Sequence, residues 1–277
     1  MLSLVQDRRG RFSPMRAIML TVLCAPMLQV AFLAVTGGLG GRPVMEATHR
    51  TGDWAVYFLL LSLGVTPLRA ALDWQRILPL RRMIGVAAAC YAGVHVLIYC
   101  YDQKWNMLTV ATEIVLRFYL TIGFVTVLGL LVLAVTSTDG MIQRLGRRWK
   151  KLHRLVYPLA VLALFHYYLQ SKADVSAAVF VSGLFFWEML WRVTPRAARL
   201  NWWPLPVLAV LAAMVTAVVE FAWYGLATKI NPMQVIAANL DLSYGPRPAI
   251  LVLFAGVVLA LVCGLRRWRQ RRAMATA

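Results

Sequence analysis

Three of the four histidines lie in or beside apolar segments, where an ionisable side chain is costly and by default suggests a function. His95 is thirteen residues after Arg82 and six before Tyr101 on one such segment. His166 is thirteen residues after His153 on another, a rise of roughly 20 Å along a helix. Neutral imidazole is a good iron ligand, and helix bundles build cofactor sites from facing side chains. Two histidines at matching depth on different helices can therefore supply both axial ligands of one haem.

His95 and His166 are the pair that meets this requirement, because both are predicted to lie in the outer half of the membrane. Gly93 near His95 and Ala163 near His166 are small enough to admit a flat macrocycle. One alternative is that each histidine only bonds a backbone carbonyl of the bundle. Another is a transporter or channel whose histidines bind metal or relay protons. Transporters usually show internal repeats and broken mid-membrane helices, and the sequence shows neither.

His153 has no partner at its depth, since the position where a matching histidine is expected is Arg82. An inner bis-histidine site is therefore incomplete. His153 could bind a second cofactor with another ligand, contact a flavin, or cap the start of its helix. Glu188 and Glu220 lie within later apolar segments, and their spacing in the sequence does not indicate a partner for either carboxylate.

The composition places these residues in a membrane protein. The 277-residue chain is 61% hydrophobic and 14% charged, with a mean hydropathy of +0.68, whereas soluble domains carry about 25% charged residues. A bilayer core needs roughly 20 apolar residues per helix, and continuous apolar runs exclude the alternating pattern of a barrel. We therefore predict an all-α polytopic helix bundle with eight spans, at about Ala17–Thr36, Trp54–Leu72, Met83–Tyr101, Phe118–Thr136, Leu155–Gln170, Val175–Trp191, Leu205–Ala227 and Ala249–Leu265.

The positions of the basic residues predict the orientation of these spans. A net charge of +18 would suit nucleic-acid binding, but the charges fall in short clusters between apolar runs, so no nucleic-acid partner is expected. With the N-terminus in the cytoplasm, 22 of the 29 Lys and Arg residues lie in cytoplasmic segments, as the positive-inside rule requires. We therefore expect both termini to be cytoplasmic. The first span follows a basic start and is expected to be an uncleaved helix rather than a signal peptide.

The densest basic cluster runs from Arg144 to Arg154 on the predicted cytoplasmic side. It sets the topology, and it could also dock an acidic cytosolic partner or a cofactor phosphate, which Arg binds through bidentate geometry. The candidate residues for this second role are Arg81, Arg82, Arg147, Arg148, Lys150 and Lys151.

Two domains are expected. Residues 1–199 hold all four histidines and form the haem-binding transmembrane domain, whereas residues 200–277 form a two-helix C-terminal membrane extension. The run Asn201-Trp202-Trp203-Pro204 marks the break between them and is typical of an interfacial aromatic anchor. Pro67 is expected to kink the second span.

Several stretches resemble the MsrQ (YedZ) family, the haem-binding membrane subunits of the bacterial MsrPQ protein-methionine-sulfoxide reductase system. The similarity covers roughly residues 20–192 and is most specific from Thr136 to His166. His95, His153 and His166 match the haem histidines of the family. The matching stretches are Gly37-Gly38-Leu39-Gly40, Thr51-Gly52, Thr66-Pro67-Leu68, Leu80-Arg81-Arg82-Met83-Ile84-Gly85, Thr136-Ser137-Thr138, Leu145-Gly146-Arg147-Arg148-Trp149, Leu152-His153 and His166-Tyr167.

The resemblance implies a ferric-reductase-like six-helix core, to which this chain adds two C-terminal helices. It implies haem b and FMN as cofactors, and a cytosolic flavin reductase or a membrane quinone as electron donor. The implied acceptor is a periplasmic MsrP-type molybdopterin reductase, in which the reduction of substrate is expected, and the implied location is the bacterial inner membrane. A ferric-reductase-like conduit with another acceptor is the alternative. No NADPH- or FAD-binding domain is recognisable, so a self-contained reductase is not expected.

Overall fold

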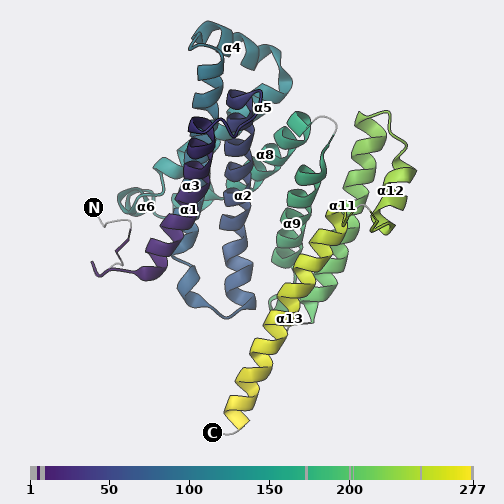
Figure 1. Cartoon of the computed structure of the whole chain (residues 1–277). Helices are drawn as coiled ribbons and strands as arrows, with labels where there is room; N and C mark the ends of the chain where they lie inside the picture. Colours follow the sequence, from purple (N-terminus) through teal and green to yellow (C-terminus); the bar gives the residue numbers. More distant parts are fainter. Residues whose placement is uncertain are drawn as a thin grey trace. The chain divides into compact units, whose positions relative to one another are not determined.

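The computed structural model describes residues 5–6, 10–171, 174–199, 201, 203–243 and 245–275. Within these ranges every regular element is a helix, as predicted, and Figure 1 labels most of them. In chain order they are α1 (Pro14–Val35), α2 (Pro43–Ala71), the short 3-10 helix η1 (Gln75–Ile77), α3 (Leu80–Asp102), α4 (Met107–Leu116), α5 (Phe118–Val135), α6 (Asp139–Leu145), α7 (Arg147–His153), α8 (Val156–Ser171), α9 (Ser176–Val193), α10 (Arg196–Arg199), α11 (Pro204–Ala227), α12 (Pro232–Leu240) and α13 (Pro248–Ala275).

Seven helices in the described part of the chain are long and apolar enough to cross a membrane, which confirms a multi-pass membrane protein. The predicted fifth span corresponds to α8, which has only 16 residues. At 1.5 Å per residue α8 is about 24 Å long, shorter than a bilayer core of about 30 Å. The eighth crossing therefore stays a prediction.

The helix α2 begins eleven residues before the predicted second span, at Pro43 rather than near Trp54. The polar residues of this stretch predict a loop, but they suit the first turns of a helix. Proline is favoured at a helix start, and Glu46 lies in the first turn, where the helix dipole favours a carboxylate. Arg50 forms an ion pair with Glu46 one turn away, at 2.7 Å. This added stretch contains Thr48 and Gly52, which lie beside His95.

The chain divides into two compact units, which we describe separately. The first comprises Met1–Ser62 and Pro79–His166, and the second comprises Leu63–Leu78 and Tyr167–Ala277. In the first unit α1 packs against α3, α3 packs against α5, and α4 lies against α5 (Figure 1). The domain boundary predicted at residue 199 stays a prediction.

Tyr91 of α3 links α3 to α1, because its hydroxyl lies between two hydrogen-bonding groups of the α1 backbone. The Tyr91 hydroxyl accepts from the Met27 N–H and donates to the Leu23 carbonyl, both at 2.8 Å. These two backbone groups would otherwise bond each other within α1, next to Pro26. The inserted hydroxyl satisfies both groups and ties α1 to α3.

In the second unit, α9, α11 and α13 pack together through small residues, and α12 lies against α11. Ala209 and Ala212 are fully buried. A Cβ on Gly183 of α9 would lie 2.3 Å from the Thr216 side chain, and one on Gly256 of α13 would lie 2.4 Å from Ala209. Glycine therefore allows these helices to approach closely, as is usual where membrane helices pack.

The helix α2 runs through Pro67 without ending, in the part that belongs to the second unit. Proline has no N–H, so the carbonyl four residues earlier, that of Leu63, loses its helical donor. Arg192 of α9 donates to this carbonyl at 2.6 Å, and its guanidinium also lies 3.8 Å from the Glu188 carboxylate. Glu188 lies against α2, since a Cβ on Gly64 would be 2.7 Å from its Oε1.

The other carboxylate without a predicted partner, Glu220, is also paired. It is fully buried on α11 and forms an ion pair with Arg247, directly before α13. Its second oxygen accepts a hydrogen bond from Asn239 of α12 at 2.9 Å. One carboxylate thus links three segments of the second unit.

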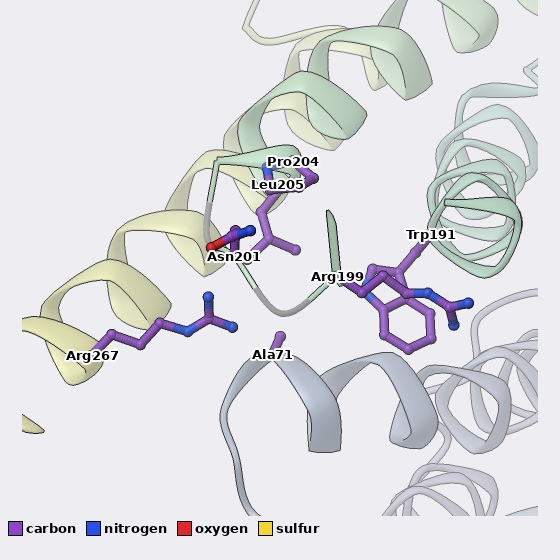
Figure 2. Close-up of a pocket in the computed structure, with 7 residues that line it drawn as sticks. All are labelled: Ala71, Trp191, Arg199, Asn201, Pro204, Leu205 and Arg267. Carbon is purple, nitrogen blue, oxygen red and sulfur yellow. The ribbon is translucent and has the colours of Figure 1, made fainter. Parts of the chain in front are cut away.

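A pocket in the second unit lies where α2, α9, α11 and α13 approach the α10 connection. Figure 2 shows Arg267 and Asn201 beside one another, and Trp191 with Arg199 across from them. The Arg199 guanidinium lies over the Trp191 ring, 4.8 Å from its centroid. The pocket is lined by Ala71, Trp191, Arg199, Asn201, Pro204, Leu205 and Arg267.

Candidate functional site

His95 and His166, the pair predicted from the sequence, lie together in the first unit. His95 is on α3 and His166 is on α8, and their ring centroids are 6.4 Å apart. The two ring planes are nearly perpendicular, at 88°. Residues separated by about seventy positions in the sequence are thus brought to one point between two helices.

Each imidazole is held by a backbone carbonyl of a neighbouring helix. His95 Nδ1 lies 2.8 Å from the Thr48 carbonyl oxygen of α2, and His166 Nδ1 lies 2.8 Å from the Tyr119 carbonyl oxygen of α5. A carbonyl can only accept, so Nδ1 carries the proton in both rings. The neutral ring then keeps the lone pair of Nε2 for a metal, which is the usual arrangement of metal-binding histidines.

Two glycines make room for these rings, and the sequence alone did not indicate their role. A Cβ on Gly52 of α2 would lie 3.0 Å from His95 Nδ1, and a Cβ on Gly123 of α5 would lie 2.7 Å from His166 Cε1. Gly93, the glycine singled out from the sequence, has nothing within 4 Å of an added Cβ. Gly52 was visible only as part of a weak Thr-Gly match, and nothing in the sequence places Gly123 opposite a histidine.

The arrangement suits a haem better than a bare metal ion. The two Nε2 atoms would hold the iron, since each Nδ1 is engaged by a backbone carbonyl. The ring centroids are 6.4 Å apart, which leaves space for one metal ion between two imidazoles that each bond it at about 2 Å. Among the described residues, no group of three His, Cys, Asp or Glu side chains is placed to hold a metal ion. Two imidazoles alone leave most coordination positions unfilled, whereas a porphyrin supplies four ligands of its own.

His153 lies apart from this pair, at the end of α7. Its ring stacks on Trp149, with centroids 3.9 Å apart, and its two nitrogens lie 3.2 Å from the Ser137 hydroxyl and the Trp149 carbonyl. Burial lowers the pKa of His153 below its usual value, and the nearby charge of Arg81 lowers it further. The structure therefore gives His153 neighbours that hold the neutral ring in place and brings no second histidine to it.

The basic candidates fall into two groups. Arg147, Arg148, Lys150 and Lys151 are exposed on α7, whereas Trp149 and His153 of the same helix are partly buried. Trp149 anchors this helix by donating from Nε1 to the Thr136 carbonyl at 2.9 Å.

The second group, Arg81 and Arg82, lies at the start of α3. Arg82 is engaged in an ion pair with Asp139 and a hydrogen bond to the Ser137 carbonyl at 3.4 Å. The positive charge of Arg81 lowers the pKa of the nearby His153. More of these basic side chains are exposed on α7 than at the start of α3.

A glycine with a left-handed backbone joins α6 to α7. Gly146 has φ of 48° and is both the C-cap of α6 and the N-cap of α7. Side chains other than glycine are strained in this region. The turn therefore requires Gly146, which lies within the most specific part of the family resemblance.

The chain is similar in sequence to known haem-binding membrane proteins. Residues 51–164 match the family described as ferric reductase like transmembrane component. A protein-methionine-sulfoxide reductase heme-binding subunit MsrQ from Rhodospirillum rubrum is 40% identical over 196 residues, which cover 70% of this chain and 92% of that protein. The subunit of the same name from Xanthomonas campestris pv. campestris is 40% identical over 159 residues, or 57% of this chain and 73% of the relative.

A third subunit of that name, from Herminiimonas arsenicoxydans, is 40% identical over 145 residues, or 52% of this chain and 66% of the relative. No solved structure matches the chain. The ferric-reductase match includes His95 and His153 and ends two residues before His166. On the combined length and identity of these matches, the chain belongs to the MsrQ family of haem-binding subunits of protein-methionine-sulfoxide reductases.

Proposed function

We propose that this protein binds haem b between His95 and His166 and transfers electrons across the inner membrane to a periplasmic methionine sulfoxide reductase of the MsrP type. The observation that carries the proposal is the pair of imidazoles 6.4 Å apart, each with Nδ1 on a backbone carbonyl. Haem iron supplies reversible one-electron chemistry at such a site. The residues of this chain supply two neutral ligands of set orientation.

The proposed direction of transfer follows from the charges. With both termini in the cytoplasm, α7 and the start of α3 face the cytosol, while the histidine pair lies nearer the opposite surface. The exposed cations of α7 attract an acidic cytosolic flavin reductase or the phosphate of FMN, which Arg binds through bidentate hydrogen bonds. Electrons then enter on the basic side, from that reductase or from a membrane quinone, and leave on the periplasmic side. The reduction of methionine sulfoxide takes place in the partner.

An absorption spectrum of the purified full chain tests the haem site directly. The wild-type protein should show a b-type spectrum that changes on reduction with dithionite. His95→Ala and His166→Ala should each lose most of the haem, because each substitution removes one of the two proposed iron ligands. His49→Ala is the matched control, since His49 is an exposed histidine on α2.

Two results would contradict the proposal. A wild-type protein without a reducible haem band would exclude an electron-transfer subunit and favour a transporter whose histidines relay protons. Full haem content in both His95→Ala and His166→Ala would place the haem elsewhere in the chain. If haem is present but a periplasmic MsrP-type partner does not oxidise it, the match to ferric reductase like proteins favours a conduit with another acceptor.

A further inference from the structure

We infer that Gly52 and Gly123 are positioning residues that hold the planes of the two proposed haem ligands close to perpendicular. This inference rests on the proposed function, since it concerns how the chain orients the imidazoles that would bind the iron. It adds two residues, on two other helices, to the histidines themselves.

The same arrangement of backbone and glycine occurs twice. On α2 the carbonyl of Thr48 accepts from His95, and glycine follows four residues later at Gly52. On α5 the carbonyl of Tyr119 accepts from His166, and glycine again follows four residues later at Gly123. A helical carbonyl points along the axis toward the residue four positions ahead, so a side chain at that position would stand beside the hydrogen bond. Glycine leaves this space to the imidazole.

An added methyl group would clash with the ring at Gly123 and would be tight against it at Gly52. An added Cβ on Gly123 would be 2.7 Å from His166 Cε1, 2.8 Å from Nδ1 and 3.1 Å from Nε2. An added Cβ on Gly52 would be 3.0 Å from His95 Nδ1 and 3.1 Å from Cε1. Ordinary van der Waals contacts of a Cβ begin near 3.4 Å. The atoms that would be struck belong to a rigid ring, so the whole ring has to turn or slide away from its carbonyl.

Ring orientation is therefore set from two sides. The carbonyl fixes the direction of Nδ1, and the glycine leaves open the space beside the ring that a Cβ would occupy. Together these contacts produce an angle of 88° between the two planes. Hydrogen bonds and packing around an axial ligand are levers by which a protein tunes a haem.

The angle between axial imidazoles has a direct spectroscopic consequence. Parallel planes direct both ligand π systems at one iron d orbital, which gives a rhombic low-spin ferric spectrum. Perpendicular planes address two d orbitals almost equally, which gives a spectrum with an unusually large highest g value. Electron paramagnetic resonance of the ferric protein therefore reports the ring angle, and the midpoint potential reports the same change independently.

The experiment compares Gly52→Ala and Gly123→Ala with wild type in the full chain, purified in detergent with its haem. We expect both variants to show a smaller highest g value and a shifted midpoint potential. The change should be larger for Gly123→Ala, because its contacts are closer. Haem content, measured as the pyridine haemochrome, accompanies each spectrum.

Two glycines serve as matched controls. Gly129→Ala crowds α5 against α8, since its Cβ would lie 2.4 Å from Leu159, but the three atoms nearest to that Cβ all belong to Leu159 and none to an imidazole. Gly85→Ala adds a methyl group to α3 at an ordinary distance, 3.7 Å from the Ser62 hydroxyl. Both should keep the wild-type g values, although Gly129→Ala should lower the unfolding temperature.

The possible outcomes separate positioning from crowding. A Gly123→Ala protein that is monodisperse but lacks haem, beside a Gly129→Ala protein that retains it, supports the inference, since they differ in the imidazole contact. Equal haem loss in those two variants overturns it, as do wild-type g values and potentials in haem-loaded Gly52→Ala and Gly123→Ala. If Gly123→Ala does not insert, the milder Gly52→Ala decides. A wild-type protein without haem overturns the proposed function itself, which distinguishes the two failures.

Discussion

Arg192 of α9 donates a hydrogen bond to the backbone carbonyl of Leu63 of α2 at 2.6 Å, and the two residues are 129 positions apart in the sequence. This is the carbonyl that Pro67 leaves without a helical donor. In a bilayer no water is present to take that role, so an unsatisfied carbonyl costs several kcal/mol. Arg192 therefore allows α2 to continue through a proline and at the same time lies beside the buried carboxylate of Glu188.

Replacing Arg192 should destabilise the protein strongly. Arg192→Gln removes the cation that lies 3.8 Å from the Glu188 carboxylate and weakens the bond to Leu63, and breaking a buried charged pair in this way typically costs about 3–5 kcal/mol. Thermal unfolding in detergent measures the loss. Arg196→Gln, an exposed arginine on the adjoining α10, is the control and should unfold like wild type.

The role of Pro67 can be tested by a double-mutant cycle. Pro67→Ala restores an N–H that can bond the Leu63 carbonyl within α2. The cost of Arg192→Gln should therefore be smaller in the Pro67→Ala background than in wild type, by roughly the 0.5–3 kcal/mol seen for coupled sites. Strictly additive effects would show that Arg192 acts only through Glu188.

The ion pair of Glu220 and Arg247 should also be sensitive to the loss of one partner. Glu220 is fully buried, so Arg247→Ala leaves a charge in a membrane helix and should cost about 3–5 kcal/mol. Glu220→Gln combined with Arg247→Gln removes both charges and should be the milder change. Urea- or heat-induced unfolding of the two proteins compares them, and a double variant less stable than Arg247→Ala would refute this account.

His153→Ala should lower haem content less than His95→Ala or His166→Ala. Its ring is held by Trp149 and Ser137, and no other histidine of the described chain lies opposite it. The pyridine haemochrome assay, normalised to protein, measures the difference. An equal loss from all three substitutions would contradict a single outer site and indicate a second haem on the side of α7.

Neutralising the exposed face of α7 should slow reduction of the haem by its cytosolic donor. The variant replaces Arg147, Arg148, Lys150 and Lys151 with glutamine, which removes four exposed charges. Reduction by dithionite should be unchanged, because it needs no docking surface. Stopped-flow spectra with each reductant make the comparison.

Those four residues also contribute to the positive-inside signal, so the insertion of the variant has to be verified first. Donor-dependent reduction at the wild-type rate in correctly inserted protein would show that the cluster serves topology only. Electron entry would then lie elsewhere, at a quinone site.

The number of crossings is testable with reporter fusions. Fusions after Arg199 and at the C-terminus should both report the cytoplasm if α8 crosses the membrane despite its 16 residues. A periplasmic signal at the C-terminus would reduce the count to the seven helices that are long enough by themselves.

The membrane class and the helices could be predicted from the sequence, because both depend on local properties. A bilayer requires about 20 apolar residues per helix, and such runs are visible without any knowledge of packing. The depth of a residue along its helix follows from a rise of 1.5 Å per residue. His95 and His166 could therefore be paired from their distances to the helix ends, and the structure places their rings side by side.

The residues that hold those rings depended on tertiary structure. The polar stretch from Pro43 to Asp53 reads as a loop, yet it extends α2 and brings the Thr48 carbonyl to His95. A carbonyl is present at every position, and a glycine in a helix is usually a packing residue, so neither carries a signal until the facing helix is known. The partners of Glu188 and Glu220 were equally hidden. Arg247 is 27 residues from Glu220 in the sequence, and Arg192, although one turn from Glu188, is directed by a carbonyl that Pro67 exposes on another helix. Which side chains of two helices meet depends on how the helices are arranged against each other, and the periodicity and composition of the sequence do not encode that arrangement.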